Sequence, residues 1–215
     1  MAPEHGLRER KKQQTKQSIA ETARHLFAER GFEHVSVAEV ARAADVSVAT
    51  VFNYFPTKED LVYVSLEQFE AELLASIRER RPGESALSAF GVFVLKPRGL
   101  LASPDPEKTA EFLALTRMVA ASPALLAREH EIFARYTESL TRLLVDETRA
   151  RVDDPSPTIA AASLIGVHRA LIAYVRERVR TRDPDIARLG RDTRAYGSRA
   201  LSFLDPALGN YAIKD

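Results

Sequence analysis

Residues 36–55 read SVAEVARAADVSVATVFNYF, and this stretch decides the fold of the 215-residue chain. Ser36 followed by Glu39 is the pattern of a capping box, which predicts that a helix begins at the next residue. Asp45 stands where the chain must turn, because Asp tolerates a left-handed backbone better than most residues. Ser47 can then cap a second helix. Two short helices joined in this way are typical of a helix-turn-helix.

The side chains of this stretch divide into an inward and an outward face. We expect the inward face to hold the apolar and small residues Val37, Val40, Ala41, Ala44, Val51 and Phe55. The outward face of the second helix then consists of Val48, Ala49, Thr50, Asn53 and Tyr54. These side chains are short or uncharged, so they can lie against a DNA duplex without steric conflict. The pattern leaves open whether Asn53 reads a base, contacts a phosphate or faces solvent.

Basic residues stand on both sides of this uncharged face. Upstream the chain carries Arg8, Arg10, Lys11, Lys12 and Lys16 against a single Glu9, and downstream it carries Lys58. Cations around a neutral reading surface suit contacts with DNA phosphates. A basic run near a terminus is also often a solvated tail, so both interpretations of residues 8–12 stay open.

The run from Thr15 to Leu61 resembles the tetracycline-repressor family of bacterial regulators. The matching features are Gly31-Phe32, the Ser-x-x-Glu-Val-Ala opening at Ser36, the aromatic run Phe52–Phe55 and Pro-Thr-Lys-Glu-x-Leu from Pro56. Asp45 replaces the glycine that the family usually has in the turn. The resemblance covers roughly the first third of the chain, to about residue 72.

The resemblance implies how the chain would contact double-stranded operator DNA. Val48, Ala49 and Thr50 would face bases in the major groove, while Ser36, Tyr54 and Lys58 would hold phosphates. The predicted DNA-contacting set is completed by Ser47, Asn53, Arg10, Lys11 and Lys12. The family binds as a two-fold dimer, which implies half-sites about one helical turn apart or a small multiple of that. It also implies control by a small-molecule effector.

Helical periodicity dominates the rest of the chain, which predicts an all-α fold. We expect helices over residues 58–80, 84–95, 106–121, 123–151, 157–181 and 184–204. The first of these would connect a DNA-binding domain over residues 1–56 to a regulatory and dimerisation domain over residues 57–215. The loop Lys96–Asp105 contains three helix breakers and is expected to be mobile. Whether it gates a pocket stays open.

Large apolar residues of the middle helices are expected first of all in the core. Because the resembling family forms an effector pocket in this region, the resemblance implies that Phe93, Leu115, Met118 and Phe133 line one. His168 lies on the same apolar helix face as Leu164 and Leu171, which favours a core or interface histidine. A contact between His168 and the effector is the alternative.

Residues 157–181 are apolar around most of the circumference of the expected helix. A helix with apolar residues on several sides must be covered on several sides, so we expect a partner subunit to cover one of them. The last helix would complete this homodimer interface, and Gly166 would permit close approach. The predicted interface residues are Leu164, Leu171, Ile172, Val175, Tyr196 and Leu201.

Composition excludes several other classes of protein. Hydrophobic residues make up 45% of the chain, which is enough for a core, and the net charge of +1 argues neither for nor against nucleic acid. The chain has no cysteine, and its five histidines are scattered, so we expect no metal and no cofactor. No stretch approaches the roughly 18 apolar residues of a membrane span, and no signal peptide is visible. We therefore expect a cytoplasmic protein with no membrane partner.

These patterns together predict a sequence-specific DNA-binding transcriptional regulator. By default it would be a repressor that releases its operator when an effector binds the C-terminal domain. No glycine-rich phosphate loop, nucleophile elbow or spaced carboxylate pair stands out, so we expect no enzyme. Two alternatives stay open: a small-molecule-binding helical protein with a vestigial DNA-binding unit, and a helical enzyme that uses the central pocket.

Overall fold

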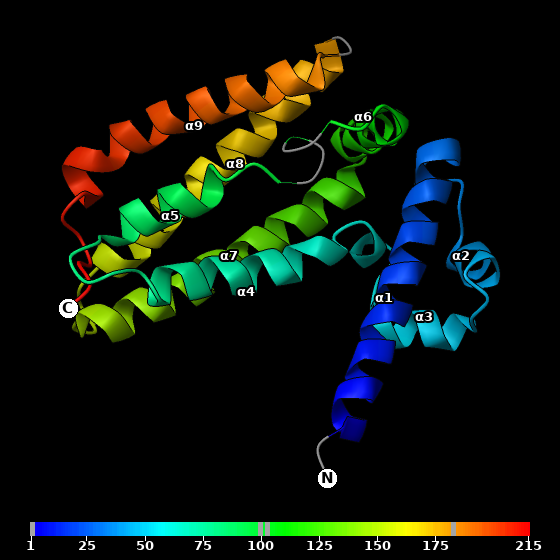
Figure 1. Ribbon diagram of the computed structural model, residues 1–215, viewed down its shortest axis with the longest axis horizontal. Helices are drawn as coiled ribbons and strands as arrows, with labels where there is room; N and C mark the ends of the chain where they lie inside the picture. Colours follow the sequence, from blue (N-terminus) through cyan, green and yellow to red (C-terminus); the bar gives the residue numbers. More distant parts are fainter. Residues whose placement is uncertain (1–2, 99–100, 102–103, 182–183) are drawn as a thin grey trace. The chain divides into compact units, whose positions relative to one another are not determined.

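The computed structural model describes the backbone of residues 3–98, 101, 104–181 and 184–215, and their side chains except those of residues 3–9, 67 and 107. In these ranges the regular elements are helices, with one isolated bridge between Ser85 and Ile213 (Figure 1). The predicted all-α class is confirmed. The chain forms two compact units: unit 1 is Met1–Ser65 with Ala110–Arg128, and unit 2 is Leu66–Thr109 with Glu129–Asp215.

Unit 1 is built from α1 (Pro3–Arg30), α2 (Val37–Ala43), α3 (Val48–Tyr54) and the 3-10 helix η1 (Glu59–Leu61). α1 ends at Gly31, whose φ of +82° is a left-handed conformation that glycine adopts without strain. The aromatic rings of Phe27 and Phe32 then meet edge to face across this turn, with centroids 5.2 Å apart. Buried side chains from all four elements form one small core: Ile19, Phe27, Phe32, Val40, Val51, Phe55 and Leu61.

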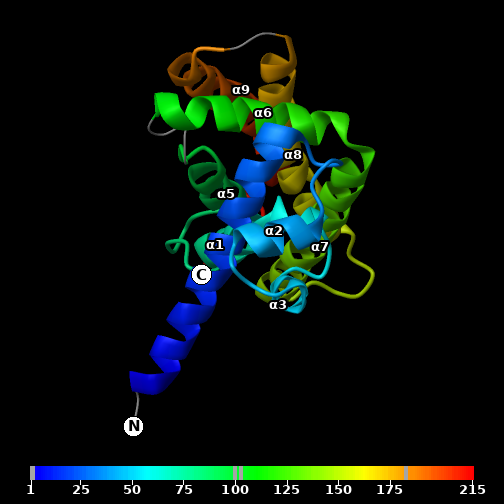
Figure 2. The ribbon, with the colours of Figure 1, turned by 90° about the vertical axis from the view of Figure 1, so that its right-hand side faces the viewer.

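The basic N-terminal stretch belongs to α1 itself. Figure 2 shows this helix running well past α2 and α3 towards the N-terminus. Residues 8–18 are mostly Arg, Lys, Gln and Glu, which are good helix formers, so nothing in the sequence breaks the helix there. The predicted arm is therefore the first turns of a rigid helix.

The helix that was expected over residues 58–80 is divided in two. η1 covers Glu59–Leu61, and α4 begins only at Val64 and runs to Arg78. A run of branched and aromatic residues at 62–64 lowers helix propensity at the break. The Tyr63 hydroxyl also donates a buried hydrogen bond to the carbonyl of Leu125, 2.8 Å away, which fixes the break within unit 1.

Unit 2 contains most of α4 and α7 (Pro123–Thr148), together with α5 (Ala86–Val94), α8 (Ser156–Thr181) and α9 (Ile186–Leu208). α6 (Pro106–Ala121) contributes residues to both units. α8 and α9 run antiparallel side by side, with α5 against them (Figure 1). Gly197 permits this packing, because a Cβ there would lie 2.4 Å from Leu95 and 2.9 Å from Leu171.

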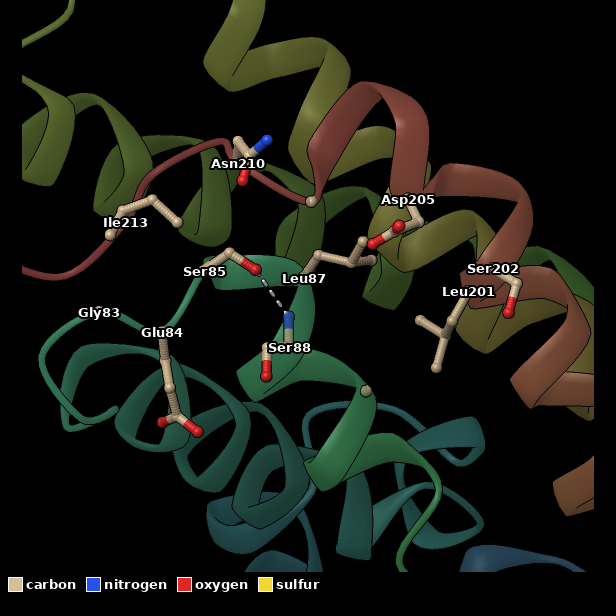
Figure 3. A pocket seen from close by; sticks show the side chains of 12 residues that line it. Gly83, Glu84, Ser85, Leu87, Ser88, Leu201, Ser202, Asp205, Asn210 and Ile213 are labelled. Atoms are coloured by element: carbon tan, nitrogen blue, oxygen red, sulfur yellow. Dashed lines mark hydrogen bonds between the residues drawn. The ribbon is translucent and has the colours of Figure 1, made fainter.

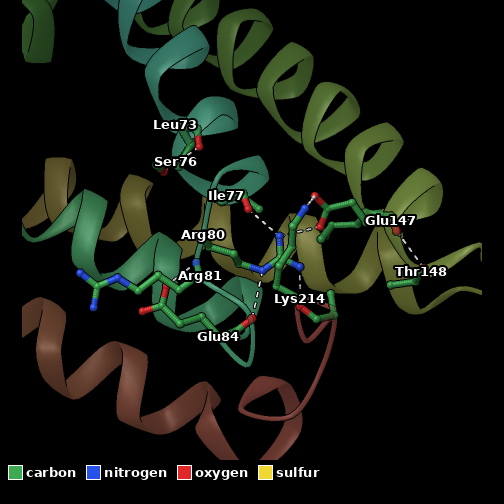
Figure 4. Close-up of polar contacts among 11 residues, drawn as sticks. Leu73, Ser76, Ile77, Arg80, Arg81, Glu84, Glu147, Thr148 and Lys214 are labelled. Carbon is green, nitrogen blue, oxygen red and sulfur yellow. Dashed lines mark hydrogen bonds and ion pairs between the residues drawn. The ribbon is translucent and has the colours of Figure 1, made fainter.

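A buried arginine ties the C-terminal tail of unit 2 to its helices (Figure 4). The guanidinium of Arg80 pairs with Glu147 at 2.6 Å and donates to the carbonyl of Ala212 at 2.7 Å. The side chain of Arg80 is 1% exposed and that of Glu147 is 15% exposed. Lys214 adds a second cation 3.5 Å from Glu147. One charge cluster therefore joins the end of α4, the last turn of α7 and residues 212–214.

α8 corrects one expectation from the sequence. Within the described residues it is long and apolar enough to cross a membrane, and the sharply bent pair α6–α7 would be a second candidate if counted as one span. The core helix of a folded domain meets the same criteria. Only 39% of the apolar window of α8 is buried in the structure. One side of α8 is therefore core of unit 2, and its other side lies open.

Candidate nucleic-acid interface

The start of α2 is fixed by the predicted capping box. The Ser36 hydroxyl accepts from the Glu39 N–H at 3.2 Å, and a Glu39 carboxylate oxygen accepts from the Ser36 N–H at 2.8 Å. Arg30 at the end of α1 pairs with the other oxygen of Glu39 at 2.7 Å. The backbone bond from Ser36 and then the Arg30 guanidinium lower the pKa of Glu39 to about 2. An ionised carboxylate thus joins α1 to α2.

The turn and the cap of α3 also have the predicted geometry. Asp45 has a φ of +52°, the left-handed conformation that this position requires. The Val46 N–H returns to the carbonyl of Ala41 at 2.9 Å, which closes the turn. The Ser47 hydroxyl accepts from the Thr50 N–H at 3.0 Å and hydrogen-bonds the Thr50 hydroxyl at 2.8 Å. α3 is therefore held at a defined angle to α2.

The inward face of α3 is as predicted, but its outward face includes a residue that the sequence analysis missed. Val51 and Phe55 are 1% and 2% exposed, while Ala49 and Asn53 are exposed. Thr50 and Tyr54 are half-buried at one edge of this face. Phe52 is 48% exposed, next to Val48 at 41%. A helix turns about 100° per residue, so Phe52 lies between Val48 and Ala49 around the helix axis. This spacing was the signal in the sequence that Phe52 belongs to the outward face.

Lys58 has a structural partner at the position where a phosphate contact was predicted. Its ammonium donates to the carbonyl of Phe32 at 2.6 Å and lies 4.2 Å from the centroid of that ring. This contact fastens the segment after α3 to the turn between α1 and α2. An ammonium has three N–H donors, and the bond to Phe32 uses one. Contact with a phosphate therefore stays a proposal.

Other cations of unit 1 face solvent. Arg10, Lys11 and Lys12 are exposed on α1, upstream of Lys16, whose ammonium lies 5.7 Å from the Phe55 ring at the end of α3. Arg42 is exposed in the last turn of α2, three residues before Asp45, the left-handed residue of the turn. Sequence reasoning missed Arg42, although its place just before the turn was a visible signal. α3 itself carries no charge.

The segment between α3 and α4 is anchored inside unit 1. Asp60 accepts from the backbone N–H and the hydroxyl of Thr57 at 3.0 and 2.9 Å. Its other oxygen pairs with the guanidinium of Arg128 at 2.8 Å. The ion pair to the first turns of α7 was not visible in the sequence, because 68 residues separate its members.

Three of the five predicted effector residues come together in unit 2. The His168 ring stacks on Phe69 with centroids 4.4 Å apart and meets Phe133 edge to face at 5.4 Å. Phe93 contacts Phe69 at 5.1 Å, and the Arg98 guanidinium lies 4.0 Å from the Phe93 centroid. Burial, with a smaller contribution from Arg98, lowers the pKa of His168 to about 4.

The other two predicted effector residues, Leu115 and Met118, are half-buried on α6 in unit 1. The loop Lys96–Asp105 falls partly on residues 99–100 and 102–103, which lie outside the described residues. Whether this loop gates a pocket therefore stays open.

Two of the predicted dimer residues are buried inside unit 2 instead. Leu164 and Leu171 are 1% and 6% exposed, and Leu171 packs against Gly197 within the α8–α9 hairpin. They therefore offer a partner little surface. Ile172 and Val175 are half-buried, as is Tyr196, which stacks on Tyr174 at 4.6 Å.

Leu201 lines an open groove of about 710 Å³ between α5, α9 and the C-terminal tail (Figure 3). The groove walls mix apolar side chains with serine hydroxyls and the carboxylate of Asp205. This groove could not be predicted from the sequence, because its lining comes from the distant segments 83–91 and 201–213.

Comparison with known proteins agrees with this geometry. The profile of the bacterial regulatory proteins of the tetR family matches residues 19–63. The transcriptional regulator TcmR of Streptomyces glaucescens is 28% identical over 69% of this chain and 67% of its own length. LuxR of Vibrio harveyi is 57% identical over 47 residues, 22% of this chain and 23% of its own. The structure of FadR from Bacillus subtilis in complex with stearoyl-CoA covers 87% of this chain and 96% of its own, with a TM-score of 0.52 and 20% identity.

The matched segment 19–63 contains the capped helices α2 and α3 and the turn between them. The sequence match, the helix-turn-helix geometry and the all-helical fold thus point to one conclusion. This chain is a DNA-binding transcriptional regulator whose residues 19–63 match the tetR family of bacterial regulatory proteins.

Proposed function

We propose that this regulator binds operator DNA as a homodimer in the cytoplasm and represses transcription until a small molecule binds unit 2. The observation that carries the proposal is the uncharged, exposed face of α3, held at a defined angle to α2 by the Ser47 cap and the turn at Asp45. A rigid helix of this kind fits the major groove of DNA. The relatives found are named as regulators, and we propose no enzyme activity.

In this proposal, α3 reads bases and the cations around it hold phosphates. Val48, Ala49, Thr50 and Asn53 face the base pairs, with Ser47 positioning the helix as its cap. Ser36, Tyr54 and Lys58 contact the backbone. Exposed cations of α1 and α2 add further phosphate contacts: Arg10, Lys11, Lys12 and Arg42.

The test is to select duplexes from a random library with the full chain and measure their affinity by fluorescence anisotropy at several salt concentrations. The Lys11→Ala, Lys12→Ala double variant should bind every duplex more weakly and reduce the salt slope by about 2, one for each phosphate contact. Arg151→Ala is the matched control, because Arg151 is an exposed cation in unit 2. Failure to enrich any sequence at low salt would contradict the proposed operator binding.

The homodimer would form through the open side of α8. Ile159 is 59% exposed, and Ala162, Gly166 and Ala173 follow it on the same exposed stripe. Small side chains let two helices approach closely, and most of the apolar window of α8 is unburied within the subunit. A second copy of α8 would supply the missing cover. This stripe replaces Leu164 and Leu171 as the proposed interface.

Gly166 allows a test that spares the fold of the subunit. A Cβ at Gly166 meets no atom within 4 Å, so Gly166→Arg adds a charged side chain to the open face without a clash inside unit 2. We expect this variant to sediment as a folded monomer and to lose operator binding. Gly166→Ala is the control and should remain dimeric. A dimer that persists in Gly166→Arg would refute this interface.

The proposed effector site is the aromatic cluster of Phe69, Phe93, Phe133 and His168 in unit 2. It offers apolar rings together with the cation of Arg98. FadR of Bacillus subtilis, which shares the fold, was crystallised with stearoyl-CoA, so a ligand can occupy a protein of this architecture. A thermal-shift screen of hydrophobic metabolites, followed by operator release in anisotropy, tests this part. Thermodynamic linkage is reciprocal. An effector that weakens DNA binding must therefore bind the protein–DNA complex more weakly than it binds the free protein.

A further inference from the structure

We infer that Phe52 and Val48 form an apolar ridge that reads the 5-methyl groups of thymine, so that each operator half-site contains thymines at fixed positions. The inference rests on the DNA binding of α3 and adds the class of base that this helix selects. Phe52 is not among the residues that the sequence resemblance assigns to DNA.

Phe52 and Val48 lie one helical turn apart on the same side of α3, where side chains at i and i+4 are neighbours. Phe52 is 48% exposed and Val48 is 41% exposed. Among the described residues of unit 1, they are the two large apolar side chains that are exposed to solvent. Leaving a phenyl ring half in water without a partner is unfavourable, because burial of apolar surface is what drives such rings inward. The neighbouring core positions Val51 and Phe55 are already filled, so Phe52 cannot turn inward.

The rest of the exposed face determines how close this ridge comes to the bases. Ala49 stands at the centre of the face and adds a single methyl group, so α3 can lie deep in the groove. Phe52 flanks Ala49 on one side and Asn53 flanks it on the other. The side chain of Thr50 is half-buried and its hydroxyl bonds Ser47, which leaves it at the edge.

The chemistry of the face favours A·T base pairs. Thymine presents an apolar methyl group in the major groove, and adenine presents the N6 and N7 pair that a carboxamide such as that of Asn53 can bond. The commonest reader of guanine is an Arg or Lys side chain, and α3 contains neither. An apolar ridge beside one amide therefore matches thymine and adenine better than guanine and cytosine.

Replacing thymine by deoxyuridine tests this directly, since the change removes only the methyl group. The duplex is first selected from a random library with the full chain, and each thymine is then replaced singly. We expect about a fourfold loss of affinity at one or two positions in each half-site, the size that burial of one methyl group corresponds to. Replacements elsewhere should change the affinity by less than 1.5-fold.

The variant Phe52→Ala completes the test. It should bind the thymine duplex more weakly than the unchanged protein does, and it should no longer distinguish thymine from deoxyuridine at the sensitive positions. Val92→Ala, at an apolar residue of unit 2 that is 73% exposed, is the control and should keep the full discrimination.

Three results would overturn the inference. These are a selected half-site without thymine, uniform tolerance of deoxyuridine, and a Phe52→Ala protein that discriminates as well as the unchanged one. In the last case Phe52 would serve another contact, which a changed sedimentation coefficient of that variant would reveal. Failure to select any duplex would instead count against the proposed operator binding, which separates the two hypotheses.

Discussion

The helix-turn-helix of unit 1 and the junction of α4, α7 and the C-terminal tail in unit 2 are stabilised over very different distances along the chain. In the former, the deciding bonds join Ser36 to Glu39 and Ser47 to Thr50, three residues apart. In the latter, Arg80 reaches Ala212 across 132 positions of sequence. A segment fixed by its own neighbours keeps one shape in many settings. A segment fixed by distant partners changes when any of them moves, which suits a region that responds to a ligand.

Among the tests of this contrast, removal of the Arg80 charge should have the largest effect on stability. Arg80→Met keeps a straight side chain but leaves the Glu147 carboxylate with only Lys214 beside it in the cluster. Breaking a buried ion pair costs about 3–5 kcal/mol. For a chain of this size each kcal/mol lowers Tm by about 2–4 °C, so circular dichroism should show a fall of about 10 °C.

Arg151→Met is the control for this change. Arg151 and Asp153 form an ion pair whose side chains are 87% and 78% exposed, and such pairs contribute at most about 1 kcal/mol. Equal losses in the two variants would show that the Arg80 cluster does not tie the tail to the helices. Hydrogen exchange of peptides from residues 36–55 should be unaffected in both, because that segment lies in unit 1.

His168 should give unit 2 a dependence on pH that begins near neutrality. Burial keeps its ring neutral in the folded state, with a pKa of about 4 against 6.5 in the unfolded chain. The unfolded state therefore gains a proton first, and stability is lost as pH falls from 6.5 to 4. The difference corresponds to about 3 kcal/mol over this range. His168→Phe, which can keep the ring stack on Phe69, should show a flatter slope of unfolding free energy against pH.

The measurement is urea unfolding at pH values between 7 and 4.5. Carboxylates titrate in the lower part of this range in both proteins, so the difference between the two slopes isolates His168. Parallel curves would mean that His168 does not remain neutral in the folded protein.

The same contrast explains what the sequence could predict. Caps and turns depend on residues three to five apart. The starts of α2 and α3 and the role of Asp45 could therefore be predicted from residues 36–55 alone. Leu171 illustrates the limit: periodicity shows that α8 is apolar on several sides, but not which side packs on Gly197 within the subunit. The hydrogen bond from Lys58 to the Phe32 carbonyl, 2.6 Å away, could not be predicted either, because 26 positions separate the two residues. Phe52, by contrast, was predictable, because the 100° helical turn places it on the outward face of α3 between Val48 and Ala49.

The smallest expected effect tests whether local strain acts alike in both regions. Asp45 and Arg149 are non-glycine residues with φ values of +52° and +51°, each just after a helix. A left-handed conformation costs a side-chain-bearing residue about 1–2 kcal/mol, partly offset because glycine gains more freedom in the unfolded chain. Asp45→Gly and Arg149→Gly should therefore each stabilise their unit by about 0.5–1 kcal/mol.

Hydrogen exchange of peptides from residues 36–55 and 123–155 measures the two changes separately. Arg149→Gly should gain at least as much as Asp45→Gly, because Asp tolerates this conformation better than Arg does. A gain confined to Asp45→Gly would show that distant contacts of unit 2 determine the backbone even at a helix end. Equal gains in stability from the two substitutions would show that the helix ends of both regions are governed by local backbone conformation. The two regions would then differ only in how their helices are joined to one another.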